Sequence, residues 1–165
     1  MEVVGTILGV ILGGLITWFI GSEQRKHDLS KEKRELLLSK YEELHSLLGK
    51  LQGHVNEMVM QIVTEASTNS KFDPKAIKSQ MPLEQITMLI EFYVPELKKD
   101  HEYIKKQTKF LIEHVCKHIM EVDKTKEFLT ESAVMAHELS KATNNTVTSM
   151  KSILAANASA LLENA

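Results

Sequence analysis

The stretch LLSKYEELHSLLGKLQGHVNEMVMQI, residues 37–62, decides the fold class of this 165-residue chain. Its apolar residues recur at alternating intervals of four and three positions, which places them on one face of a helix. This bundle seam consists of Leu37, Tyr41, Leu44, Leu48, Leu51, Val55, Met58 and Ile62. Further apolar residues, such as Leu47 and Val59, widen the face beyond a strict coiled-coil seam. We therefore expect a long helix that packs against two or more neighbours.

Before this stretch, the sequence contains 18 consecutive residues without a charge, from Val3 to Ile20. A helix needs about 20 mainly apolar residues to cross a bilayer, and about 17 suffice. The chain is therefore predicted to have a transmembrane anchor over residues 1–22 and a helical domain over residues 23–165. A cleaved signal peptide is the alternative, but the basic start and the small residues of a cleavage site are missing here.

Basic residues follow the predicted span, whereas only Glu2 precedes it. By the positive-inside rule, the N-terminus lies outside and the large domain is cytoplasmic. Arg25 and Lys26 stand next to the span, so they are also candidates for contact with lipid headgroups. The layout resembles that of several bacterial membrane scaffolds in plan only, and we expect a bacterial inner-membrane protein.

Small residues recur every fourth position within the predicted span. Gly5, Gly9, Gly13 and Thr17 would lie along one helix face and let a second helix approach closely. This pattern predicts helix–helix contact in the membrane, either between copies of the chain or with a membrane-protein partner. Glycine is also common in membrane helices without any such role.

After residue 66, turn-forming residues predict a loop over 67–82, and two further helical regions follow at about 83–122 and 124–162. Pro95 either kinks the first of these regions or starts a new helix there. Asp123 is the expected cap of the last helix. The predicted fold class is all-α: one transmembrane helix followed by an antiparallel bundle of three to four helices, similar to a coiled coil.

The composition gives little support to enzymatic or nucleic-acid chemistry. The net charge is −2, from 20 basic and 22 acidic residues, so no basic field suggests nucleic acid. No phosphate-binding loop, nucleophile motif or complete zinc-protease motif occurs, and we expect neither an enzyme nor a bound cofactor. The single cysteine, Cys116, permits no internal disulfide.

His114 and His118 lie one helical turn apart, a spacing that can hold a transition metal if further ligands are supplied. The alternative is a pair of surface histidines beside a buried Cys116.

The sequence leaves three functions open. The first is a scaffold, adaptor or regulatory subunit that self-associates or assembles with a membrane partner. The second is a membrane-acting effector of toxin or defence type, whose glycine-row helices cluster in the bilayer. The third is a ligand or metal sensor that uses the bundle.

Overall fold

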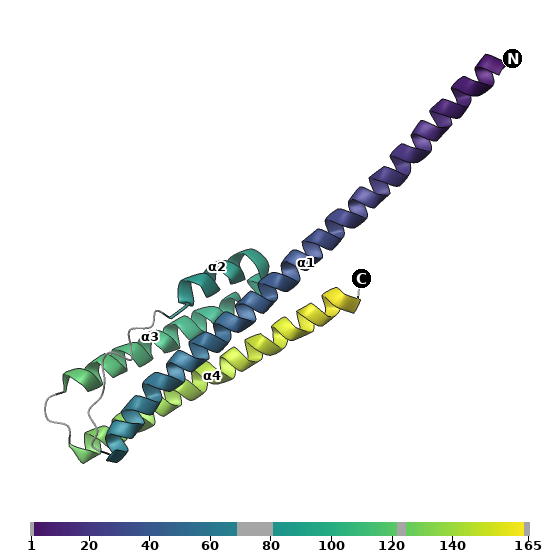
Figure 1. The fold of residues 1–165 in the computed structure, drawn as a ribbon. Coiled ribbons are helices and arrows are strands. Elements are labelled where there is room, and N and C mark those ends of the chain that lie inside the picture. The colour runs from purple at the N-terminus through teal and green to yellow at the C-terminus, as the bar shows by residue number, and fades with distance from the viewer. Residues whose placement is uncertain (1, 69–80, 122–124, 164–165) are drawn as a thin grey trace. The chain divides into compact units, whose positions relative to one another are not determined.

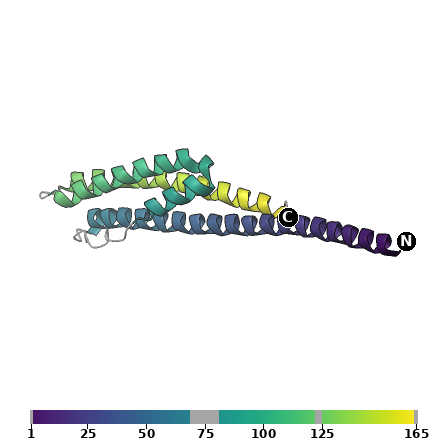
Figure 2. The same cartoon turned by 90° about the horizontal axis from the view of Figure 1, so that it is seen from above.

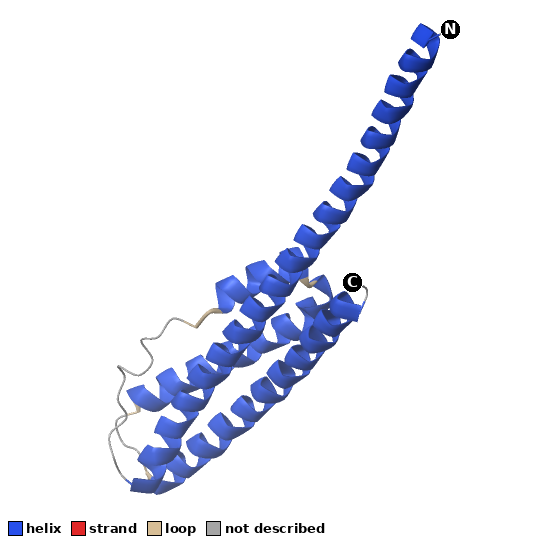
Figure 3. Ribbon diagram, turned by 45° about the vertical axis from the view of Figure 1, so that its right-hand side comes forward, coloured by secondary structure: helices blue, strands red, loops and turns tan. Residues whose placement is uncertain are grey.

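The computed structural model describes the backbone of residues 2–68, 81–121 and 125–163. It describes the side chains of residues 28–68, 81–118, 121 and 125–163. Within these ranges the chain forms helices and no strand (Figure 3). The elements are α1 (Glu2–Thr68), α2 (Leu83–Tyr93), the 3₁₀-helix η2 (Pro95–Leu97), α3 (Lys98–Met120) and α4 (Lys126–Glu163). The predicted all-α class and the helical bundle are confirmed.

The chain divides into two compact units, Met1–Ser39 and Lys40–Ala165. The first unit is the N-terminal part of α1, in which Leu29 and Leu36 are exposed. The predicted span Val3–Ile20 belongs to the part of α1 whose side chains lie outside the described residues, so it stays a prediction. Among the described residues, no helix combines the length and the apolar character needed to cross a membrane.

The second unit contains the core. In Figures 1 and 2, α3 and α4 lie side by side with opposite chain directions. Six of the eight seam residues, from Leu44 to Ile62, are buried in this core, and Tyr41 packs against it. α2 contributes Ile86, Leu89 and Ile90, and α4 contributes Val147, Met150 and Leu154. Leu37, the remaining seam residue, belongs to the first unit.

The chain reverses direction at Pro95, although the sequence also allowed one kinked helix over 83–122. Thr87 and His101 are hydrogen-bonded across this corner, which a continuous helix would keep far apart. Proline disfavours helical geometry in the preceding residue and has no N–H of its own. Val94 and Leu97 are both fully buried, so the turn at Pro95 packs against the core through these two side chains.

Thr125 caps the start of α4. Its Oγ1 accepts a hydrogen bond from the N–H of Phe128 at 3.2 Å, and its carbonyl accepts one from Leu129 at 3.0 Å. Asp123, the cap expected from the sequence, lies outside the described residues. The helix then runs through the Asn144–Asn145 pair without a break.

Candidate functional site

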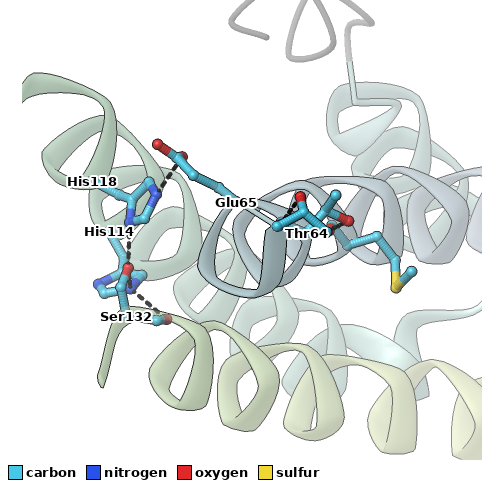
Figure 4. A network of polar contacts seen from close by, with 7 residues as sticks. Thr64, Glu65, His114, His118 and Ser132 are labelled. Carbon is cyan, nitrogen blue, oxygen red and sulfur yellow. Dashed lines mark hydrogen bonds and ion pairs between the residues drawn. The ribbon is translucent and has the colours of Figure 1, made fainter. Parts of the chain in front are cut away.

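A buried polar network joins three helices of the second unit, with His118 of α3 at its centre (Figure 4). His118 is fully buried, and both of its ring nitrogens have partners. Nδ1 lies 2.7 Å from Oγ of Ser132 in α4, and Nε2 lies 2.8 Å from Oε2 of Glu65 in α1. Glu65 and Ser132 are themselves buried, so these contacts replace water for all three groups.

His114 adds a fourth member to the network, one helical turn before His118. Its Nε2 lies 3.0 Å from the backbone carbonyl oxygen of Ser132 and 3.0 Å from Ser132 Oγ. A carbonyl oxygen can only accept, so Nε2 of His114 carries the proton and donates. His114 and His118 of α3 therefore contact the same residue of α4, Ser132.

The partners also define how the remaining protons are arranged. In one arrangement that satisfies all partners, Ser132 Oγ accepts the His114 N–H and its hydroxyl donates to Nδ1 of His118. His118 then holds its own proton on Nε2 and donates to the carboxylate of Glu65. In this arrangement, each donor of the network has an acceptor.

An aromatic ring covers the network from α4. The rings of His118 and Phe128 are stacked, with centroids 5.6 Å apart and an angle of 17° between their planes. The stacking limits rotation of the imidazole, so it helps to keep each nitrogen aimed at its partner. The network is thus built from both packing and hydrogen bonds.

The network shares residue types with a carboxylate–histidine–serine triad. Ser132, however, is only 2% exposed, and its oxygen is already contacted by two histidine nitrogens. A nucleophile must reach a substrate atom at about 3 Å with an oxyanion site nearby. Ser132 lies inside a helix, whose backbone N–H groups are used in the helix itself. We therefore interpret the network as a structural connection between helices.

The histidine pair also differs from the arrangement expected of a metal site. His114 and His118 share a helix face as predicted, but Ser132 and Glu65 contact Nε2 of His114 and both ring nitrogens of His118. Among the described residues, no three histidine, cysteine or carboxylate side chains converge on one point. The alternative, with surface histidines and a buried cysteine, is wrong: His118 is buried and Cys116 is exposed.

A second buried histidine, His101, links α3 to α2. Oγ1 of Thr87 donates to the carbonyl of Leu83 and lies 2.7 Å from Nε2 of His101, which therefore donates to it. Nδ1 of His101 is buried without a hydrogen-bond partner in the described structure. Burial lowers the pKa of His101 below its usual 6.5, and Lys105 adds to this, while Glu102 and Glu91 oppose it.

Polar side chains also connect α1 with α4. Asn56 Oδ1 accepts hydrogen bonds from Asn144 Nδ2 at 2.8 Å and from Ser140 Oγ at 3.3 Å. Lys151 Nζ donates to Gln52 Oε1 at 3.4 Å, about one turn of α1 before Asn56. Such bonds form in one register only, so they favour a single alignment of α1 against α4.

A surface groove of about 550 Å³ lies between α1 and the start of α2. Its lining mixes apolar and charged side chains: Leu47, Lys50, His54, Met81, Pro82, Leu83, Glu84 and Gln85. The groove and the polar network are lined by different residues, so a molecule bound in the groove would not touch His118.

The candidate residues named from the sequence fall into two groups. The seam residues Leu44 to Ile62 and the two histidines are described and buried or half-buried. The helix-interface residues Gly5, Gly9, Gly13 and Thr17, and the lipid-contact residues Arg25 and Lys26, have side chains outside the described residues. Glu65 and Ser132 were missed, because a lone acidic or hydroxyl residue on a helix gives no distinct signal.

Comparisons with protein-family models, with curated proteins and with solved structures find no match for this chain.

Proposed function

We propose that this chain is a membrane-tethered helical scaffold or adaptor that works by associating with further copies or with a membrane partner. The observation that carries the proposal is the exposure of large apolar side chains on the outside of an otherwise closed core. On α2, Met88 is 50% exposed and Phe92 is 75% exposed, one turn apart. On α3, Tyr103 and Phe110 are 44% and 45% exposed. Met88 and Phe92 lie one turn apart on the same helix, and exposed apolar surface of this kind is a candidate interaction site.

The described interior also supports a structural role. Three helices exchange buried hydrogen bonds at the His118 network, and α1 is aligned with α4 by Asn56. A bundle held in one register presents its outer faces in a constant arrangement. A constant surface is what a scaffold offers to its partners.

The proposed tether is the N-terminal span with its glycine row. Substituting Gly9→Ile would place a branched side chain between closely packed helices, so we expect it to weaken self-association. Gly14→Ile is the matched control, because Gly14 lies off the row. The measurement is the mass of the full chain in mild detergent by light scattering. Equal masses for wild type and Gly9→Ile would refute the glycine interface.

The exposed Cys116 gives a direct test of topology, since it is the only cysteine of the chain. If the large domain is cytoplasmic, a membrane-impermeant maleimide labels Cys116 in lysed cells and not in intact cells. Labelling in intact cells would place the domain outside and reverse the proposed topology. Resistance of the chain to alkaline extraction from membranes tests the anchor itself.

The alternative of a membrane-acting effector makes a different prediction. Clustered glycine-row helices that breach the bilayer would collapse the membrane potential and stop growth on overexpression. A scaffold leaves both intact. Measuring potential and growth with wild type and Gly9→Ile side by side separates the two functions.

A further inference from the structure

Two exposed stripes of opposite charge lie on α2 and α3. The acidic stripe is Glu84, Met88 and Glu91 of α2, and the basic stripe is Lys99, Tyr103 and Lys106 of α3. Each has the spacing i, i+4, i+7, which places three residues on one helix face. All six side chains are exposed. Both stripes therefore read charge, apolar, charge, with the sign of the charge reversed between them.

The four charged residues of these stripes form no ion pair among the described residues. Glu84 and Glu91 form no ion pair with a described cation, and Lys99 and Lys106 form none with a described carboxylate. The neighbouring lysines of α3 differ, because Lys105 pairs with Glu102 at 3.0 Å and Lys109 approaches Glu113 at 3.8 Å.

Each stripe also belongs to a helix of matching net charge. α2 contains two glutamates and no basic residue. α3 contains six lysines and three acidic residues. The net charges of the two helices therefore attract each other, in the same sense as the charges of the two stripes do.

Apolar groups lie at the centre and at the edge of both stripes. Met88 and Tyr103 are the central residues, and Phe92 and Phe110 extend the apolar surface beside them. Lys106 Nζ lies 5.9 Å from the centre of the Phe110 ring, so the basic stripe and this aromatic residue form one surface. Covering such side chains removes apolar area from water, which stabilises an interface at roughly 25 cal/mol per Å².

We propose that the acidic stripe of one copy docks on the basic stripe of a second copy, with Met88 against Tyr103 between two ion pairs. The occupant is a second copy because each chain carries both complementary halves, and each half faces solvent in its own bundle. This inference rests on the proposed function, since it identifies the surface through which tethered copies meet. Confinement to a membrane raises the effective concentration of the copies, which makes a small interface sufficient.

Charge reversal in the full chain, reconstituted in lipid vesicles so that the copies stay confined to a membrane, tests this docking. Glu84→Lys/Glu91→Lys and Lys99→Glu/Lys106→Glu each bring like charges together, so each should lower the association constant by more than about tenfold. Combining all four substitutions in one chain restores complementarity and should restore association. A mixture of the two double variants should also associate, although neither does so alone.

Cross-linking locates the contact. Carbodiimide treatment of mixed ¹⁵N-labelled and unlabelled copies should join Glu84 or Glu91 of one copy to Lys99 or Lys106 of the other. Mass spectrometry identifies such pairs by their mixed isotopes. Glu131→Lys/Glu138→Lys on α4 is the matched control, with the same spacing on another exposed face. It should leave association and these cross-links unchanged.

The proposal is overturned if the double variants associate as well as wild type, if the fourfold variant fails to recover while its helix content is native, or if the cross-links form only within one copy. The same series in a Gly9→Ile background separates this docking from the glycine row. A charge effect that persists there supports the stripes even if the glycine interface is wrong.

Discussion

His118 Nε2 lies 2.8 Å from Glu65 Oε2, and this buried contact ties α3 to α1 across 53 positions of the sequence. The other ring nitrogen of His118 is bound to Ser132, so one imidazole joins three helices at one level of the bundle (Figure 4). Because the ring is fully buried, water cannot replace a lost partner. The stability of the bundle should therefore be sensitive to each member of this network.

Substituting Glu65→Ala should destabilise the bundle by about 3 kcal/mol, because the N–H of His118 loses its acceptor in a buried site. Glu65→Gln keeps an acceptor oxygen and should cost roughly 1 kcal/mol. The free energy of unfolding, measured by urea titration followed by circular dichroism, gives both values. Glu57→Ala, at an exposed position of the same helix, should change it by less than about 0.5 kcal/mol. A cost for Glu65→Ala as small as that of the control would contradict this account.

Removing the bridging hydroxyl with Ser132→Ala should cost roughly 1–2 kcal/mol, since Nδ1 of His118 is left without a donor. The backbone carbonyl of residue 132 still accepts from His114, so that contact should survive. Ser149→Ala, exposed on the same helix, is the control. The double variant with Glu65→Ala should cost less than the sum of the single variants, because both act on one imidazole. Additive costs would mean that the two contacts are independent.

The periodicity of residues 37–62 was sufficient to predict the main core face, because burial on a helix follows from spacing alone. The same rule, applied to α3, would have placed His118 inside, since it continues the buried stripe of Ile104, Leu111 and Val115. The sequence instead suggested either a metal-binding pair or a pair of surface histidines, and neither interpretation placed His118 in the core. The partners of His118 are 14 and 53 residues away, and no local pattern reports such distant contacts.

The reversal at Pro95 was one of two possibilities that the sequence left open. A proline at the start of a helix and a proline that kinks one give the same local signal. Whether the helix kinks or a new helix begins depends on the burial of Val94 and Leu97, and this burial is a property of the folded unit. The stripes on α2 and α3 were missed for a related reason: their complementarity becomes visible only once both faces are known to be exposed.

His101 should make the stability of the bundle depend on pH. Its pKa is lowered in the folded state, chiefly by burial, so the unfolded chain binds a proton more readily. Above the usual pKa of 6.5, both states are neutral and stability is unaffected. As the pH falls below 6.5, stability should decline until the lowered pKa of the folded state is reached.

His101→Leu should reduce this decline, and His137→Leu, at an exposed position of α4, should not. The measurement is the free energy of unfolding between pH 7.5 and pH 5 for wild type and both variants. Unchanged slopes in all three proteins would exclude His101 as the source. The polar network around His118 is present in every variant, so its own response to pH cancels in the comparison.

Gly53 offers a test of how far helix propensity limits the stability of α1. It lies in the interior of the helix, and a Cβ added there would meet no atom within 4 Å. Gly53→Ala should therefore stabilise the bundle by about 0.5–1 kcal/mol, because alanine restricts the unfolded chain and suits a helix better.

At Gly49 the added Cβ would lie 3.4 Å from Lys151 Nζ, the atom that donates to Gln52. Gly49→Ala should gain less, since that contact between α1 and α4 has to adjust. Equal gains at both positions would show that the Lys151 contact contributes little, and a loss at Gly53 would show that the surface around it is covered in the native assembly.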